Sequence, residues 1–560
     1  MNRENLVQRL GPWLPFLLWE RPDGPLLKSE ALAGVTVGLM LVPQGIAYAS
    51  LAGMPLITGI YASMLPALIA VLFSASPRLS VGPTALTCLM VSASLTGLAA
   101  PGSARWIELA MWLALLSGVL QIALGYLRSG WLLSLVNAPV LMAFTQGAAV
   151  LIIGSQLPAM LGVSGGLAGL LALSAIPAMP ALHLPTLAFG LGAYGVLLLA
   201  RRLPKTVPTV LLLVVVTSGL SAWSGFEGRG GAVIGDLPQG LPGLSLPGWP
   251  GWEVLGQLLL PTLLITLVSF LETASSARVD SREQGQRWNR ERDLIGHGLG
   301  KIAAGFSGAF PTSTSFSRSA LNRYAGARTG WSVIFSVAVV ALALLFTPAL
   351  HHVPMAVLAA IVVAAVQGLI APLEFVRVWK VSRVEAGIAV VTFAVTVASA
   401  PRLYWGVLTG VVMALSHFLY MRLHPRIIEV GLHPDGSLRD RHLWNLPALG
   451  PRTFALRMDA ALDFATANDL ERSITLYIAR HPDTQRVVLI AHPINWIDAT
   501  GVEVFATLQS QLHAQGIALH LVGLKLPVER VLKAAGLLGE HPLLQLHRTE
   551  AEALQGDWAG

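Results

Sequence analysis

The sequence contains very little cysteine and very little charge. Cys88 is the single cysteine among 560 residues, which excludes an intramolecular disulfide and a cysteine-rich metal site. Charged residues make up only 12% of the chain, whereas hydrophobic residues make up 54%. Soluble domains have about twice that share of charged residues. We therefore expect a polytopic membrane protein.

Other absences exclude an enzyme and a nucleic-acid-binding protein. The sequence offers no nucleophile with a base beside it and no phosphate-binding loop, so no catalytic residue and no cofactor are expected. His351 and His352 are neighbours that would point in different directions on a helix, and neither has an acidic partner at a turn's spacing, so no metal site is expected. The net charge of +7 is spread over many short connections instead of forming a basic stripe, which makes a nucleic-acid partner unexpected.

Apolar segments recur along most of the chain, for example at residues 31–51, 57–73 and 407–420. A full span needs about 20 residues. These segments are predicted to be helices, because no barrel-type alternation is visible. The first apolar run lacks a small-residue cleavage site, so no removable signal peptide is expected.

Lysine and arginine in the short connections predict the topology. If both termini are cytoplasmic, the connections rich in lysine and arginine all fall on the cytoplasmic side and the opposite loops hold few basic residues, as expected for a multi-pass protein of the cell's inner (plasma) membrane. After about Pro425 the sequence changes from apolar spans to mixed, soluble-type sequence. We therefore predict a cytoplasmic N-terminal segment at residues 1–30, a transmembrane transport domain at 31–424 and a cytoplasmic domain at 425–560.

The C-terminal region, roughly 130 residues, reads as a soluble α/β domain in which short strands alternate with amphipathic helices. It is either a folding and assembly module or a ligand sensor. The predicted strands are residues 454–458, 486–490 and 518–524, and the predicted helices are residues 467–480, 501–515 and 528–537.

Two stretches, residues 79–85 and 310–319, interrupt the apolar sequence in the same way. In each, glycine or proline breaks the run, small hydroxyl residues follow where an N-cap is needed, and a helical segment continues. Free N–H groups at such a helix start attract anions. Arg318 adds a charge that costs about 3 kcal/mol in hydrocarbon unless it faces a cavity or a partner. The pattern predicts an anion site at the middle of the membrane.

Several motifs resemble those of one known family, in the family's order and over nearly the whole chain. They are Leu41 to Ala49, Ser80 to Thr84, Gly235 to Pro238 with Gly240 to Pro242, Ser315 to Asn322, Ala325 to Thr329, and Asp498 to Val502. Together they resemble the SulP anion permeases, solute carrier family 26, and the last of them is similar to part of the STAS domain that this family carries.

The resemblance implies an all-α polytopic membrane domain of 14 transmembrane segments in two inverted repeats of seven, followed by a soluble α/β STAS domain. The membrane domain would be divided into a core and a gate, an architecture similar to that of nucleobase carriers. The third and tenth segments would be the two half-helices and would meet head to head at the substrate. A homodimer is usual among the resembling proteins.

Candidate substrate-binding residues follow from these motifs. Gln44 and Tyr48 are four residues apart and share a helix face, and the matching positions contact substrate in the resembling family. The alternative for Tyr48 is an interfacial belt tyrosine. Thr84 and Ala85 open the first half-helix. The second contains Ser317 and Arg318, and for Ser317 the alternative is a helix-stabilising hydroxyl.

Glu272 lies within an apolar segment, where a carboxyl group must be either protonated or paired. A protonated carboxyl could carry a proton with the anion, and the resembling family often uses an acidic residue in this segment for cation coupling. Alternatively, Glu272 forms a structural ion pair with Arg318. Lys301 stands where relatives generally have asparagine, and it either pairs with Glu272 or extends to the cytoplasmic surface.

Two further features concern the cytoplasmic side. Residues 374–385 alternate basic and apolar side chains and are predicted to form an interfacial helix. Asp498 to Gly501 corresponds to the loop where related anti-sigma-factor antagonists are phosphorylated on serine. Because Ala499 cannot accept phosphate, the regulatory candidate is Thr500 or none.

The sequence thus predicts a secondary active transporter of a small anion of the sulfate, bicarbonate or dicarboxylate class. Coupling to protons, with sodium as the other coupling ion considered, and alternating access by an elevator-like or rocking displacement are expected. The partners would be the anion, the coupling ion, the lipid bilayer and a second copy of the chain. The alternatives are an uncoupled exchanger or channel of the same fold, a membrane-anchored STAS signalling scaffold, and a nucleobase carrier.

Overall fold

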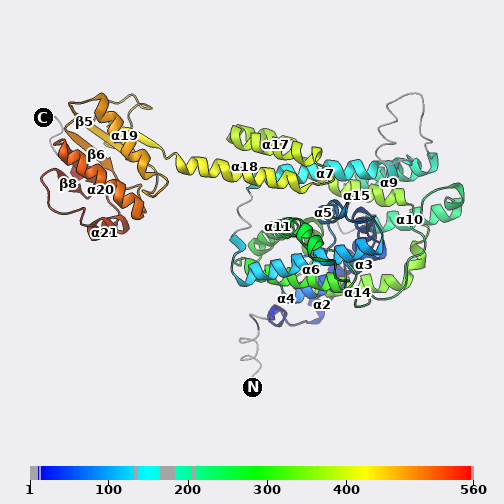
Figure 1. Cartoon of the computed structure of the whole chain (residues 1–560). Coiled ribbons are helices and arrows are strands. Elements are labelled where there is room, and N and C mark those ends of the chain that lie inside the picture. Colours follow the sequence, from blue (N-terminus) through cyan, green and yellow to red (C-terminus); the bar gives the residue numbers. More distant parts are fainter. Residues whose placement is uncertain are drawn as a thin grey trace, which may run out of the picture. The chain divides into compact units, whose positions relative to one another are not determined.

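The computed structural model describes Gly11 and residues 14–131, 137–163, 183–200, 202 and 208–555. Part of the predicted N-terminal segment, residues 1–10 and 12–13, lies outside the described residues. The chain forms two compact units, Met1–Ala414 and Leu415–Gly560 (Figure 1). The division falls within one helix, α18 (Tyr404–Leu423).

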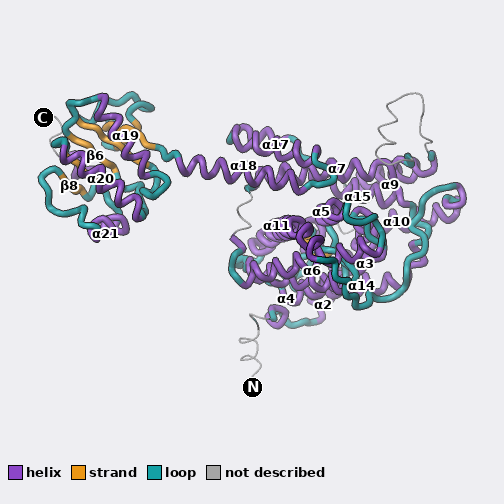
Figure 2. The backbone as a smooth tube through the Cα atoms, viewed as in Figure 1, coloured by secondary structure: helices purple, strands orange, loops and turns teal. Residues whose placement is uncertain are grey.

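Unit 1 is built of helices joined by loops (Figure 2). Seven described helices are long and apolar enough to cross a membrane, so the count of fourteen segments stays a prediction. In chain order the elements before α18 are η1 (Pro15–Leu18), α2 (Gly24–Leu51), α3 (Ile57–Tyr61), α4 (Leu65–Phe73), β1 (Val81–Gly82), α5 (Ala85–Leu95), α6 (Ala104–Tyr126), α7 (Ala138–Leu161), α9 (Leu184–Ala200), α10 (Thr209–Ser224), η3 (Glu227–Arg229), α11 (Trp252–Glu283), α12 (Arg290–Phe306), β2 (Ser313–Thr314), α13 (Phe316–Tyr324), α14 (Trp331–Ala343), η4 (Leu344–Leu350), α15 (Met355–Val366), η5 (Gln367–Leu369), α16 (Leu373–Val381) and α17 (Arg383–Ala398).

The helices of unit 1 pack mainly within two groups. In the first helix group, α12 packs against α6 and α4, α14 packs against α2, and α11 and α13 join them. In the second helix group, α7 packs against α15 and α17, and α9 packs against α15 and α10. Helix α2 also contacts α10 and α15, so it lies where the two groups meet.

The second apolar segment is broken, contrary to the prediction of one span at residues 57–73. It divides into α3 and α4, and Pro66 occupies the first turn of α4. Proline has no N–H to donate and is tolerated at a helix start, so it favours a new helix over a continuous one. Here α3 lies very close to α2, because a Cβ on Gly59 would lie 1.9 Å from the backbone oxygen of Gly45.

A short antiparallel ladder joins the two interrupted stretches. Val81 pairs with Thr314 and Gly82 with Ser313, and the Ser315 N–H donates to the Ser80 carbonyl over 3.0 Å. Pro83 and Thr84 separate β1 from α5, and Ser315 alone separates β2 from α13. The residues just before both helices are therefore held together by backbone hydrogen bonds.

The expected hydroxyl caps are present at both helix starts. The Thr84 side chain accepts a hydrogen bond from the Thr87 N–H, and the Ser315 side chain accepts one from the Arg318 N–H. Each cap satisfies one of the N–H groups that a helix start leaves without an intrahelical partner.

The predicted helix at residues 374–385 is two helices instead. Ser382 has an extended backbone between α16 and α17, and its hydroxyl accepts from the Glu385 N–H. A serine that caps a new helix ends the preceding one. The continuous interfacial helix is therefore wrong beyond α16.

Unit 2 has a six-stranded sheet in the order β4-β3-β5-β6-β7-β8, in which β5 to β8 are parallel and β3 and β4 antiparallel. The three predicted strands and three predicted helices are found, with end shifts of up to three residues. The elements are β3 (Ile427–Leu432), β4 (Leu438–Asp440), β5 (Thr453–Met458), α19 (Ala467–Arg480), β6 (Arg486–Ile490), α20 (Ala499–Ala514), β7 (Ala518–Val522), α21 (Leu526–Ala534), β8 (Leu544–His547) and α22 (Glu550–Leu554).

Both faces of this sheet are covered by apolar contacts. Leu456 and Leu489 belong to a cluster with residues of α19, α20 and α21, whereas Val488 and Val522 belong to a second cluster with Ala553 of α22. Burial of both faces explains the nearly continuous apolar runs of β5, β6 and β7. Unit 2 is thus a layered α/β fold with its own core.

The close approach of α2 and α3 predicts a sharp penalty for one methyl group. We expect Gly59→Ala to lower the free energy of unfolding by about 1–3 kcal/mol, because the added Cβ collides with the Gly45 carbonyl. The matched control is Gly219→Ala in α10, where the added Cβ meets nothing within 4 Å. This substitution replaces a glycine that weakens the helix, so it should not lower the free energy of unfolding. Thermal unfolding of the purified protein in detergent, followed by tryptophan fluorescence, checks this. Equal unfolding temperatures for the two variants would contradict the close approach.

Candidate functional site

A cavity of about 570 Å³ lies between the two helix groups of unit 1. Residues of α2 and α13 from the first group line it, and residues of α9, α10 and α15 from the second group face them. On α2 the lining residues are Thr36, Met40, Gln44 and Tyr48, spaced every four positions along one helix face. The predicted shared face of Gln44 and Tyr48 is therefore the face that lines the cavity.

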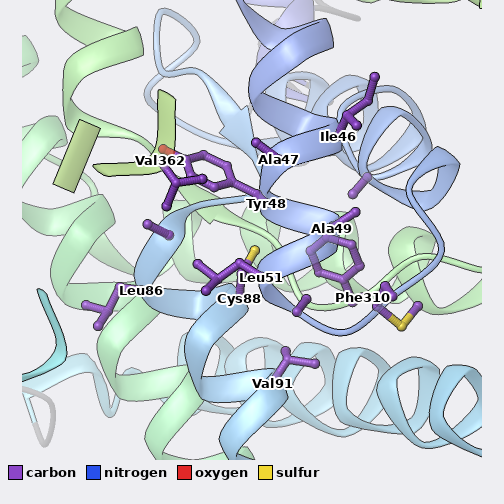
Figure 3. Packing of buried hydrophobic residues seen from close by; sticks show 14 of the residues in the cluster. Ile46, Ala47, Tyr48, Ala49, Leu51, Leu86, Cys88, Val91, Phe310 and Val362 are labelled. Carbon is purple, nitrogen blue, oxygen red and sulfur yellow. The ribbon is translucent and has the colours of Figure 1, made fainter. Parts of the chain in front are cut away.

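Tyr48 lies deep in the protein, with 6% of its surface exposed. Its ring belongs to a buried cluster with Leu86 and Cys88 of α5 and Val362 of α15 (Figure 3). An interfacial belt tyrosine would present its ring to the headgroup region, and the burial of this ring in a protein cluster favours the substrate-binding prediction over that alternative. Tyr48 instead forms an apolar wall with a polar tip at the boundary of the two helix groups.

Arg318 is almost completely buried, with 1% exposure, and all three of its guanidinium nitrogens donate hydrogen bonds. Nε donates to Ser80 Oγ over 3.3 Å, Nη1 to Gln44 Oε1 over 3.5 Å, and Nη2 to the Pro83 carbonyl over 3.0 Å. The side chain of α13 thus binds the residues that precede α5 and the cavity face of α2.

The acceptors of Arg318 are neutral. Within the described part of the chain, no carboxylate oxygen lies within 4.0 Å of its guanidinium, so the structural ion pair with Glu272 is not formed in this structure. The positive charge is therefore solvated by dipoles and not cancelled by a contact with an anion of the protein.

Glu272 lies on α11 and is partly buried. Its Oε2 accepts from Thr84 Oγ1 over 3.1 Å and from Thr87 Oγ1 over 3.5 Å. Thr84 is also the N-cap of α5, so the carboxyl group sits at the start of this half-helix. Hydroxyl partners can reorient, and they therefore accommodate both a charged and a neutral carboxyl group.

Lys301 adopts neither of the two expected arrangements. It is fully buried, and its Nζ donates to Gln121 Oε1 of α6 over 2.8 Å. Among the described residues no carboxylate lies within 4.0 Å of it, so a contact with Glu272 is not formed. Because α12 packs against α6 and α4, this face of the helix points into the first helix group and not toward a surface.

The remaining predicted positions divide between the cavity and its support. Ser317 lines the cavity and is exposed to it, whereas Thr84 and Ala85 are buried and are not among its described lining residues. Phe316 and Tyr324 of α13 also line the cavity, which the sequence did not single out. Their spacing on the amphipathic α13 is the signal that could have identified them.

Glu30 and Asp293 are among the buried carboxylates that the sequence did not single out. Glu30 on α2 is fully buried and accepts from the N–H groups of Arg328, Thr329 and Ser332, at 2.7, 2.7 and 2.8 Å. It ties α2 to the start of α14. A lone acidic residue at the beginning of an apolar segment was the available signal.

Asp293 on α12 is also fully buried. It accepts from the N–H groups of Ala75 and Ser76, at 2.8 and 3.0 Å, and from the Trp288 indole at 2.7 Å. It thereby fixes the connection between α4 and β1 to α12. Asp293 follows several charged residues in the sequence, so its burial could not be predicted from the sequence.

No acidic residue stands at a turn's spacing from His351 and His352, but the structure brings acidic partners to them from a distant part of the chain. They lie in a turn after η4 and not on a regular helix, and their rings are 4.8 Å apart. His351 Nε2 lies 3.3 Å and His352 Nδ1 3.9 Å from Glu227 Oε2, while His351 Nδ1 lies 2.7 Å from Asp236 Oδ1. Both acidic residues come from the connection before α11, which sequence spacing could not reveal.

In unit 2, Thr500 lies exposed in the first turn of α20. Asp498 caps this helix by accepting from the Gly501 N–H at 2.8 Å, and its second oxygen accepts from the Phe464 N–H at 3.0 Å. The Thr500 hydroxyl is thus accessible, and its regulatory role stays a prediction.

Comparison with known proteins gives matches over both units. The profile of the Sulfate permease family matches residues 27–392, and that of the STAS domain matches residues 450–553. A probable sulfate transporter of Mycobacterium tuberculosis is 31% identical over 539 residues, which cover 94% of this chain and 95% of that protein. The chloroplastic sulfate transporter 4.1 of Arabidopsis thaliana is 29% identical over 562 residues, covering 96% and 81%.

Solved structures share the fold. The murine solute carrier 26 family member A9 anion transporter, in the inward-facing state, superposes with a TM-score of 0.87 at 18% identity and covers 99% of this chain and 94% of its own. The transmembrane domain of a cyanobacterial bicarbonate transporter, BicA, gives a TM-score of 0.58 at 22% identity, covering 70% and 99%. The fold is therefore that of these membrane transporters.

The double role of Thr84 leads to a testable expectation. Thr84→Val should destabilise the start of α5 by about 1 kcal/mol, because it removes both the N-cap and a hydrogen-bond donor to Glu272. Hydrogen exchange measured by mass spectrometry should then show faster exchange in the peptide that contains α5. Thr84→Ser keeps the hydroxyl and should exchange like the wild type. Identical exchange in the valine variant would show that the cap does not hold this helix start.

Proposed function

The chain belongs to the sulfate permease family, and from this we propose that it is a secondary active transporter that moves a small anion across the membrane by alternating access. Its relatives are transporters and not enzymes. Anion transport is common to them, and the substrate class, the coupling ion and the mechanism of movement are our proposals. We also place the protein in the cell's inner membrane, with both termini cytoplasmic and two copies in a dimer.

The observation that carries this proposal is the position of the Arg318 guanidinium. It is buried where the starts of α5 and α13 are joined, one residue along α13 from the cavity-lining Ser317. The N–H groups of two helix starts and an uncompensated guanidinium create a positive potential. Such a potential favours an anion over a cation or a neutral ring, which argues against a nucleobase carrier.

We assign roles to the predicted residues on this basis. Gln44 accepts a hydrogen bond from Arg318 through its oxygen, so its amide N–H groups are available to a bound anion. Tyr48 supplies a wall and Ser317 a hydroxyl donor at the cavity. Thr84 and Ala85 act through the backbone N–H groups that open α5, and Thr84 also positions Glu272.

The cavity lies between the two helix groups, which suits a transporter with a moving core. We equate the first helix group with the core and the second with the gate. A displacement of the core relative to the gate would move α13 and α2, with the bound anion, past α9, α10 and α15. The site itself need not change during this movement, because α2 and α13 belong to the first group and α5 packs mainly against α11, α2 and α6 of the same group.

Glu272 is our candidate for proton coupling. Within the described residues its hydrogen-bond donors are hydroxyl groups, and no cationic side chain lies within 4.0 Å. A proton can therefore bind the carboxyl group without breaking an ion pair. Protonation removes a negative charge next to the start of α5, which makes anion binding more favourable.

Among the anion classes, we place sulfate before bicarbonate and dicarboxylates. The two relatives described above, which cover 94% and 96% of this chain, are named for sulfate. A site made of helix starts and one guanidinium selects charge more strongly than shape, so the order rests on the relatives and not on the site.

Uptake into proteoliposomes tests the transport proposal. Purified protein should accumulate labelled sulfate, and Arg318→Ala should reduce the rate at least about tenfold, since a buried charged donor contributes about 1.5–3 kcal/mol per hydrogen bond. The matched control is Arg105→Ala, whose guanidinium is 41% exposed in a surface pair with Glu108 and whose loss should leave uptake unchanged. Bicarbonate and a dicarboxylate complete the panel. Absence of uptake for all three would refute transport of these classes, and full activity of Arg318→Ala would refute the assigned site.

A second experiment tests coupling. With a proton gradient directed into the vesicles, wild-type uptake should rise, whereas Glu272→Gln should transport at a rate independent of the gradient, because an amide carries no exchangeable acid proton. Glu253→Gln, an exposed glutamate at the other end of α11, serves as the control and should keep the gradient dependence. If Glu272→Gln keeps it as well, Glu272 is not the coupling residue. Wild-type uptake driven by sodium alone, or by neither ion, would favour the other coupling ion or the uncoupled alternative.

A further inference from the structure

Two connections that join the helix groups meet at one place in unit 1. Residues 225–251 lead from α10 to α11, and residues 344–354 lead from α14 to α15. Each connection runs between one helix group and the other. Glu227 and Asp236 belong to the first connection, and His351 and His352 to the second.

Three donor atoms from these connections gather around a small volume. One ring nitrogen each of His351 and His352 and one carboxylate oxygen of Glu227 all lie within 4.8 Å of one another. The two shorter separations, 3.3 and 3.9 Å, both involve Glu227 Oε2. A tetrahedral ion with bonds of about 2.0–2.1 Å needs donors about 3.3 Å apart, so small side-chain rotations would complete the geometry.

Asp236 prepares His351 to act as a ligand. Its Oδ1 lies 2.7 Å from His351 Nδ1, so the proton of a neutral imidazole is held on Nδ1 and the lone pair is left on Nε2, which faces Glu227. A carboxylate behind a histidine ligand is the usual arrangement around protein-bound zinc.

The backbone holds the two connections in register. The Ile234 N–H donates to the Val353 carbonyl over 3.0 Å, the Gly235 N–H to the His351 carbonyl over 3.1 Å, and the Met355 N–H to the Ala232 carbonyl over 2.9 Å. The three donor side chains are therefore placed before any ion binds, which reduces the entropy lost on binding.

We propose that Glu227, His351 and His352 form a binding site for a divalent transition-metal ion of the Zn²⁺ class, with Asp236 as the positioning residue for His351. Two imidazoles and one carboxylate suit Zn²⁺ better than Mg²⁺ or Ca²⁺, which prefer all-oxygen sites. The fourth position of the ion is open to solvent. A bound ion would tie together two of the chain segments that connect the helix groups.

A hydrogen-bonded cluster without metal is the competing explanation. A protonated His351 between Asp236 and Glu227 would account for two of the short distances. It would not account for His352, whose Nδ1 at 3.9 Å is too far from Glu227 for a hydrogen bond yet turned toward the same oxygen. A shared ion explains the convergence of both rings.

Calorimetric titration of the purified, tag-free full chain with Zn²⁺ tests the site. The wild type should bind one ion more than His351→Ala or Glu227→Gln. Asp236→Asn should keep that ion with an affinity about 10–100-fold lower, as expected for a residue behind the ligand. The matched control is His541→Ala, because His541 stacks on His513 in unit 2 and provides an unrelated pair of imidazoles. This control should keep the ion that the ligand variants lose.

Substitution with Co²⁺ provides a second measurement that does not depend on the variants' yield. The wild type should show the visible absorption of four-coordinate Co²⁺, and His351→Gln should lack it while retaining the same thermal unfolding temperature in the absence of metal. Bound Zn²⁺ should raise the unfolding temperature of the wild type only. Equal Zn²⁺ stoichiometry in the wild type and His351→Ala, or Co²⁺ absorption that survives His351→Gln, would overturn the proposal. None of these measurements requires transport activity.

Discussion

The arrangement of the membrane unit depends on one buried guanidinium and the backbone ladder beside it. Arg318 donates to acceptors just before α5 and on α2, and the β1–β2 ladder fixes the same residues to the start of α13. An unpaired cation in a low-dielectric interior is costly unless dipoles solvate it. The carbonyl, hydroxyl and amide oxygens around Arg318 provide this solvation without cancelling its charge. The protein thereby keeps a positive site inside a helix bundle.

Glu30, Asp293 and Glu272 in unit 1 differ in the hydrogen-bond donors that surround their carboxyl groups. Glu30 accepts from the backbone N–H groups of Arg328, Thr329 and Ser332, and Asp293 accepts both from backbone N–H groups and from the Ser74 and Ser76 hydroxyls. Glu272 accepts from hydroxyls, which can turn and accept in their place. The first two carboxylates join segments of unit 1, whereas the third is the one for which we propose a change of protonation state.

Local features of the fold could be predicted from the sequence, and long-range partners could not. The helix starts at Ala85 and Phe316 follow from hydroxyl caps and glycine or proline within a few residues, and the strands and helices of unit 2 follow from short-range periodicity. By contrast, Lys301 binds Gln121, 180 positions away, and His351 contacts Glu227, 124 positions away. Pro66 can be recognised in the sequence as a residue that interrupts a helix. Whether a new helix starts at this proline could not be predicted from the residue alone.

The ladder between residues 81–82 and 313–314 is made by main-chain atoms alone. Main-chain hydrogen bonds persist when side chains are exchanged, so the scaffold of the proposed anion site does not depend on the side chains that surround it. Descendants of such a protein could acquire a preference for a larger or smaller oxyanion through single replacements along α2 or α13 while retaining the joined helix starts. The same architecture can therefore diversify its cargo during evolution without first being rebuilt.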